Sequence, residues 1–137
     1  MFNSTYIKSA FVGPKQKGAP ASINLVEDIN SANSIENMQK YTKELNLPIS
    51  CFLKEANKLN TFYIRYFIKD NEEQICGHGT VVATQFLIDN KLISDQSKQV
   101  EFIPLLTPDR TIISTIDNNY ISIYIKTIKP TNIDIKN

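Results

Sequence analysis

The sequence predicts an α+β domain, in which a curved, mostly antiparallel sheet wraps around one buried central helix. Short segments rich in β-branched and aromatic residues recur along the chain, as they do in sheets. Residues 80–90 have the length of a helix and are apolar on most sides, which is typical of a helix inside a fold. Residues 34–45 have apolar positions on one face only, which predicts a second, amphipathic helix.

Turn signals separate the expected strands. These strands lie at residues 6–12, 21–26, 49–53, 61–68, 99–105, 110–116 and 120–127. Glycine and proline at residues 13–18 predict a loop, and residues 70–73 predict a polar turn. Residues 117–119 are suited to a hairpin turn between the last two strands.

The first helix has recognisable ends in the sequence. Asn33 is expected to be its N-cap, with Glu36 three residues on completing a capping-box-like pair. Pro48 prevents the helix from continuing, because proline lacks the backbone N–H that the helix needs.

The composition indicates one globular domain spanning residues 1–137. Hydrophobic residues make up 42% of the chain and charged residues 21%, which suits a packed core. The formal net charge is +1 and the basic residues are scattered, which argues against nucleic acid and acidic membranes as partners. No apolar run is long enough to cross a bilayer and the first residues do not resemble a secretion signal, so a cytoplasmic location is expected.

Neither a metal nor a cofactor is expected. His78 is the only histidine, and it has no spacing to carboxylates or cysteines that would form a set of metal ligands. Of the two cysteines, Cys51 beside Phe52 is interpreted as a small core residue. A disulfide between Cys51 and Cys76 stays open as an alternative, although reduced thiols are expected in the cytoplasm.

One short motif carries chemistry. The motif lies between a polar turn and the expected buried helix, and it consists of Cys76, Gly77, His78, Gly79 and Thr80. Glycine lets backbone amides approach a ligand closely, and the first turn of a helix leaves its N–H groups unpaired. These donors, together with the positive end of the helix dipole, predict a carboxylate site formed by Gly77, Gly79 and Thr80.

Two side chains of this motif are candidate catalytic groups. A histidine side chain can donate or accept a proton near neutral pH, which makes His78 a candidate acid or base. A helix N-terminus favours the thiolate of Cys76, which would serve as a base or nucleophile. The alternative is a tight strand-to-helix turn with a buried cysteine and a histidine that only caps it, and the motif alone does not separate the two interpretations.

The flanking residues resemble the PhzF family, the phenazine-biosynthesis-like branch of the diaminopimelate epimerase fold. The resemblance is carried by the aromatic strand at residues 62–67 with its Arg65, by Glu72 four residues before the cysteine, and by the helix start at residues 76–83. Weaker matches are the turn at residues 18–21 and the first helix and its exit at residues 38–39 and 46–47. The resemblance runs in order from about residue 5 to residue 127.

The resemblance implies a reaction as well as a fold. Family members consist of two similar domains, whose central helices point their N-termini into a cleft where a carboxylated substrate loses and regains a proton. It therefore implies an isomerase or epimerase acting on a small carboxylated metabolite, with His78 and Cys76 as catalytic residues. The motif is also similar to that of proline racemases, so a racemase-like role with Cys76 as the base remains an alternative.

The sequence departs from the family at the usual base and at the second domain. The family's catalytic glutamate follows the first helix in an L-S-E-T-x-F pattern, and Ile49 stands in its place within residues 47–52. Isoleucine transfers no proton. The family's second domain has no counterpart, and residues 128–137 are expected to form a tail at the junction between the domains. Ala19 also replaces the asparagine of the family's G-N-P turn.

Different classes of function therefore remain. One is a PhzF-like isomerase whose second domain comes from a homodimer or from a separate C-terminal-domain partner. Another, favoured by Ile49, is a non-catalytic module that keeps the fold and binds or oligomerises, and a third is a remnant without function. Arg65 has two interpretations, of which a half-buried ion pair with Glu72 is preferred over contact with a ligand.

Overall fold

The computed structural model describes residues 4–9, 20–94, 98–117 and 120–127, with the backbone alone for residues 4–9. The elements are β1 (Ser4–Ser9), β2 (Pro20–Leu25), α1 (Ala32–Leu45), β3 (Ile49–Glu55), β4 (Thr61–Phe67), β5 (Glu72–Glu73), α2 (Gly77–Asp89), β6 (Gln99–Pro104), β7 (Arg110–Asp117) and β8 (Tyr120–Thr127). This order confirms every expected strand and both expected helices. Four expected features lie outside the described residues: the loop at 13–18, the Gly18–Ala19 part of the matched turn, the hairpin residues 118–119 and the tail at 128–137.

The described strands form one sheet in the order β1-β2-β3-β4-β6-β7-β8, with the short β5 paired to β4. Two pairings, β2 with β3 and β4 with β6, are parallel. The other pairings are antiparallel, so the sheet is mixed but mostly antiparallel, as expected. Each parallel pair is joined through a helix, α1 or α2, because parallel neighbours need a long crossover connection.

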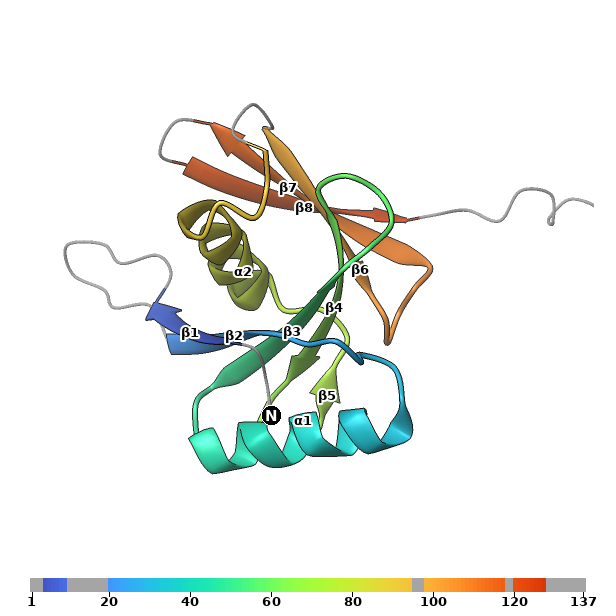
Figure 1. Ribbon diagram of the computed structural model, residues 1–137. Coiled ribbons are helices and arrows are strands. Elements are labelled where there is room, and N and C mark those ends of the chain that lie inside the picture. The colour runs from blue at the N-terminus through green and yellow to red at the C-terminus, as the bar shows by residue number, and fades with distance from the viewer. Residues whose placement is uncertain (1–3, 10–19, 95–97, 118–119, 128–137) are drawn as a thin grey trace, which may run out of the picture.

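The sheet curves around α2, and α1 lies on its outer side (Figure 1). Val82, Phe86 and Leu87 of α2 are at most 3% exposed. They belong to one cluster with the side chains that strands β2, β3, β4, β6 and β7 turn inward. The expected buried central helix is therefore confirmed.

The outer helix α1 begins earlier than expected and is capped by a different residue. Ser31 Oγ accepts the N–H of Ser34 at 3.1 Å, and Asn33 lies inside the first helical turn. Asp28 holds the cap in place, because its carboxylate accepts the Ser31 N–H at 3.0 Å and the Ser31 hydroxyl at 2.5 Å. The expectation of Asn33 as N-cap is therefore wrong. The inner side of α1 buries Met38 beside Phe52 and Phe67.

The polar turn expected at residues 70–73 is partly a strand. Glu72 and Glu73 form β5, with Glu72 opposite Phe67 and Glu73 opposite Tyr66 of β4. This pairing extends the sheet beside the segment that leads into α2. Among the residues that the structure describes, no helix is both long and apolar enough to pass through a membrane.

Candidate functional site at the N-terminus of α2

Cys76 is the N-cap of α2, and the helix begins at Gly77, three residues before its expected start. Cys76 has an extended backbone, with φ −128° and ψ 114°, and its Sγ accepts the Gly79 N–H at 3.4 Å. Its carbonyl oxygen accepts the Thr80 N–H at 3.0 Å, which is the first intrahelical bond. The residues of the candidate motif are thus brought together in the cap and first turn of one helix.

The motif has an outer and an inner side. Gly77 is exposed, and Cys76 and His78 are half-buried, so these residues reach the surface. Gly79 and Thr80 are buried, and their N–H groups already donate to Cys76. The structure therefore places Gly79 and Thr80 beneath the site, whereas Cys76, Gly77 and His78 form its accessible part.

The first turn of α2 rests directly on strands β3 and β4. A Cβ atom at Gly79 would lie 2.7 Å from Cys51 Sγ and 3.4 Å from Cδ1 of the Tyr66 ring. No side chain fits at 2.7 Å, so glycine is required here for close approach rather than for backbone freedom. The first turn of α2, which contains His78 and follows the Cys76 cap, therefore packs closely on the two strands.

Buried hydroxyl groups link α2 to the strands on two sides. The Tyr66 hydroxyl of β4 lies 2.5 Å from Thr80 Oγ1, which also donates to the Cys76 carbonyl at 2.8 Å. One turn further on, Thr84 Oγ1 is 2.8 Å from Ser114 Oγ of β7. These contacts satisfy polar groups that would otherwise be costly to bury inside the curve of the sheet.

The residues beneath the motif are buried, and their environment disfavours charge. Burial raises the pKa of the Cys51 thiol well above its ordinary value, and the neighbouring Cys76 adds to the rise. Burial likewise raises the pKa of Tyr66 well above its ordinary value. Both cysteines are free thiols, so the disulfide left open by the sequence is not formed, and Cys51 is a core residue as expected.

The residue that the family resemblance aligns with a catalytic glutamate is a core side chain. Ile49, the first residue of β3, is 3% exposed and belongs to the same cluster against which Cys76 packs. It supplies no proton acceptor to the motif. Within the described ranges, no group of three or more His, Cys, Asp or Glu side chains is arranged to hold a metal ion.

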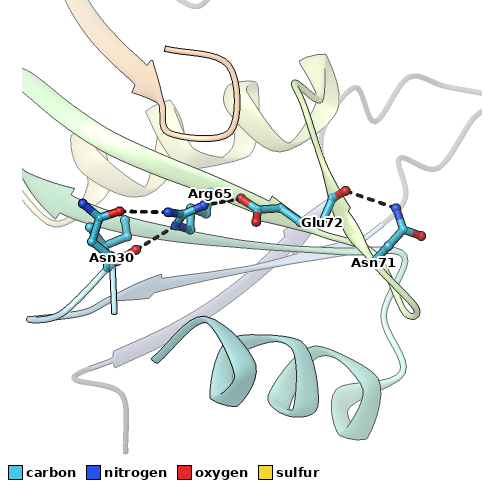
Figure 2. A network of polar contacts seen from close by, with 5 residues as sticks. Asn30, Arg65, Asn71 and Glu72 are labelled. Atoms are coloured by element: carbon cyan, nitrogen blue, oxygen red, sulfur yellow. Dashed lines mark hydrogen bonds and ion pairs between the residues drawn. The ribbon is translucent and has the colours of Figure 1, made fainter. Parts of the chain in front are cut away.

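Arg65 lies on the other face of the sheet, where it holds a polar network together. Side chains of β4 alternate, so that Ile64 and Tyr66 join the α2 cluster while Arg65 faces the α1 side. Arg65 donates to Glu72 Oε2 at 2.8 Å, to the Ile29 carbonyl at 2.7 Å and to Asn30 Oδ1 at 2.9 Å (Figure 2). The preferred interpretation of Arg65 as an ion pair with Glu72 is confirmed.

A shallow hollow on this outer face was not foreseen from the sequence. It has a volume of about 250 Å³ and is lined by Asp28, Ile29, Asn30, Lys54, Tyr63 and Leu105. These residues come from four separate segments, so no local sequence pattern predicts that they line one hollow. The hollow lies on the face away from the Cys76 motif, because Lys54 and Tyr63 point opposite to Leu53 and Ile64 of the α2 cluster.

Comparisons with known proteins agree with this fold. The sequence profile of the family described as phenazine biosynthesis-like protein (PhzC-PhzF) matches residues 8–112. An uncharacterized isomerase of Vibrio cholerae is 24% identical over 99 residues, covering 69% of this chain and 34% of that protein. A PhzF-family phenazine biosynthesis protein of Enterococcus faecalis has a TM-score of 0.71 at 23% identity, covering 85% of this chain and 41% of that one.

A second solved structure gives the same picture. A phenazine biosynthesis PhzC/PhzF protein of Clostridium difficile has a TM-score of 0.68 at 26% identity, again covering 85% of this chain and 41% of that one. The chain thus spans about two fifths of the length of these solved relatives and a third of the curated one. With a diaminopimelate epimerase-like fold and a profile match over residues 8–112, this chain belongs to the phenazine biosynthesis-like (PhzC-PhzF) family.

Proposed function

We propose that this chain supplies one half of a PhzF-like isomerase site, which transfers a proton on a small carboxylated substrate. The observation that carries the proposal is the placement of Cys76 and His78, two proton-transferring side chains, half-buried at the N-terminus of the central helix. The match to a family whose curated relative is called an isomerase supports it.

In this proposal the helix end holds the carboxylate. The positive end of the α2 dipole attracts an anion, and the exposed Gly77 lets a carboxylate come close to the backbone. The Gly79 N–H, which lies beneath this position, stays bonded to Cys76 Sγ and keeps the sulfur next to the bound carboxylate. The substrate carboxylate would then lie between Cys76 and His78.

Proton transfer in this half falls to Cys76 and His78. Ile49 removes the glutamate that the family resemblance places beside the motif, and loss of a general base slows a reaction by ~10²–10⁴-fold. We therefore expect slow exchange, with Cys76 as the base and His78 as the acid or orienting group. A cysteine base would also suit the racemase-like alternative on a proline-like acid.

Solvent deuterium exchange tests the activity. We expect slow incorporation of deuterium next to the carboxylate of a dihydro-hydroxyanthranilate-like or proline-like acid, and its loss in Cys76→Ser and His78→Ala. Leu59→Ser is the matched control, because Leu59 is 80% exposed in the turn between β3 and β4. Exchange that persists in both motif variants would place the activity elsewhere.

Restoring the missing carboxylate gives a second, opposite test. Ile49→Glu would return a base to the first residue of β3, beside the cluster that Cys76 packs against. We expect faster exchange, provided that circular dichroism shows the variant folded. A folded Ile49→Glu protein with unchanged exchange would argue against the proposed geometry.

A non-catalytic binding module is the second candidate, and Ile49 favours it. Such a module would keep the anion site at the N-terminus of α2 but would not catalyse proton transfer. Titration with 2-aminobenzoate, followed by NMR of the backbone amides at residues 77–80, would show binding in both cases. Binding without deuterium exchange identifies the module, and binding with exchange identifies the enzyme.

The second half of the site is proposed to come from outside these residues. The chain covers 41% of the length of each of the two solved relatives described above, so more than half of each relative has no counterpart in these residues. A second copy of this chain or a separate chain carrying the C-terminal domain would supply it. We place the assembly in the cytoplasm, consistent with its proposed small-metabolite substrate.

A further inference from the structure

β8 forms an edge of the sheet. It pairs with β7 along its whole length, from Asp117 opposite Tyr120 to Arg110 opposite Thr127. No described strand pairs with its other side. An edge strand of eight residues presents a row of backbone N–H and C=O groups that another strand can pair with.

This edge lacks the features that usually protect one. Natural edges carry several charges, a proline or a bulge, whereas residues 120–127 contain Lys126 as their only charged residue and no proline. Tyr120 is 76% exposed, and Tyr124 and Ile125 are each 52% exposed. These are three of the six large hydrophobic side chains that stand exposed in the described part of the chain, so exposed apolar surface is concentrated on β8.

We propose that β8 pairs antiparallel with β8 of a second copy of this chain, about a two-fold axis at Ile123. This register pairs residues 120–126 and places Ile123 opposite its own copy and Ile121 opposite Ile125, so within these residues isoleucine meets isoleucine at every position on the α2 side. On the outer side it places Lys126 opposite Tyr120, where the lysine stem and ammonium cover an exposed aromatic ring.

The alternative register centred on Tyr124 is less complementary. It would place Ile121 opposite Thr127 and Lys126 opposite Ser122, and it would leave the exposed ring of Tyr120 beyond the paired residues. Neither register brings two charges of the same sign together. The Ile123-centred register is therefore favoured by its apolar matching and by the coverage of Tyr120.

The proposed axis lies beside the candidate site. Ile123 Cδ1 is 3.4 Å from the position of a Cβ at Gly77, so the residue on the axis touches the start of α2. A two-fold axis perpendicular to the sheet keeps both helices on the same face of one continuous sheet. Both Cys76 motifs would then lie next to each other, which deepens the proposed function by naming a second copy as the supplier of the other half-site.

Charge placed at position 120 tests the register directly. Tyr120→Lys sets a lysine opposite Lys126 in two symmetric pairs, and we expect a dimer dissociation constant raised roughly 2- to 30-fold. Adding Lys126→Glu to that variant sets opposite charges together and should restore dimerisation. Leu59→Lys adds the same charge to an equally exposed apolar residue outside β8 and should change nothing. Sedimentation velocity over a concentration series measures each dissociation constant.

Amide hydrogen exchange gives a second measurement on the unaltered chain. We expect the β8 amides to exchange more slowly as protein concentration rises, because pairing protects them. A chain that is monomeric at every concentration overturns the proposal. A dimer that Tyr120→Lys does not weaken, or that Lys126→Glu does not restore, overturns the β8 register. None of these outcomes depends on catalysis, so the interface and the proposed activity are tested separately.

Discussion

The Arg65 guanidinium donates to the Glu72 carboxylate across 2.8 Å, and the two side chains are 8% and 14% exposed. The pair connects β4 to β5, and its further contacts with Ile29 and Asn30 connect both strands to the segment before α1 (Figure 2). Three separate parts of the outer face, β4, β5 and the segment before α1, are thus joined by one cation. The network is a structural clamp on the face opposite the Cys76 motif.

Removing the carboxylate of this pair should destabilise the fold. Glu72→Ala leaves the buried Arg65 without its counter-ion, and breaking such a pair lowers the free energy of unfolding by about 3–5 kcal/mol. The remaining acceptors of Arg65 favour the lower end of that range. Urea unfolding followed by circular dichroism measures the change. Glu73→Ala, which removes an exposed contact with Asn71, is the control and should cost less than about 0.5 kcal/mol.

Gly79 and Cys51 should behave as a coupled pair. Gly79→Ala drives a methyl group into Cys51 Sγ, and such overpacking costs about 1–3 kcal/mol, of which alanine's higher helix propensity offsets up to about 1. Cys51→Ala removes the sulfur, so Gly79→Ala should be neutral or stabilising in that background. A double-mutant cycle from urea unfolding measures the coupling. Additive effects of the two substitutions would contradict the close approach.

The two thiols should differ sharply in reactivity. Cys76 is half-buried at the surface, whereas Cys51 is fully buried and burial raises its thiol pKa, so little thiolate forms there. We expect Ellman's reagent at pH 8 to modify one thiol rapidly in the folded protein and the second only after urea is added. Cys76→Ser should abolish the fast phase. A fast phase that remains in that variant would show that Cys51 is accessible.

The free energy of unfolding at acidic pH should depend on Asp28. Hydrogen bonds from the Ser31 side chain, and then from the backbone of Ser31 and Asn30, hold the pKa of Asp28 below its ordinary value. A lowered folded-state pKa stabilises the fold above the ordinary pKa, and this stabilisation is lost as pH falls through the folded-state value. The loss of stability in Asp28→Ala should therefore be larger at pH 7 than at pH 2. Urea unfolding at both pH values checks it, and a pH-independent difference would contradict it.

The order of elements was predictable because strands and helices leave strong periodic signals. The alternating isoleucines of β8 indicate a strand and the apolar circumference of α2 indicates a buried helix, and the structure contains both. The parallel pairs of β2 with β3 and β4 with β6 carry no local signal, since they depend on where α1 and α2 return the chain.

The helix starts were harder to predict because the caps depend on residues outside the helix. Ser31 caps α1 because Asp28, three residues earlier, binds its N–H and hydroxyl. At α2 the sulfur of Cys76 serves as cap, although cysteine is an uncommon choice. Gly77 and Gly79 lie inside the helix although glycine has a low helix propensity, and position 79 requires glycine because Cys51 and Tyr66 leave no room for a side chain. The motif itself was predicted as a unit, and its division into exposed and buried residues required the structure.

The hydroxyl contacts of α2 determine its rotation about its own axis. A helix that is apolar on most sides loses little burial when it turns within the curved sheet, so burial alone leaves its angular setting poorly defined. Two hydroxyl contacts, Tyr66 with Thr80 and Thr84 with Ser114, remove that freedom. A rotated helix would leave buried hydroxyl groups without hydrogen-bond partners, at a cost of about 1–3 kcal/mol each. The direction in which Cys76 and His78 face is therefore set by side chains on β4 and β7, two strands that contain none of the motif's own residues.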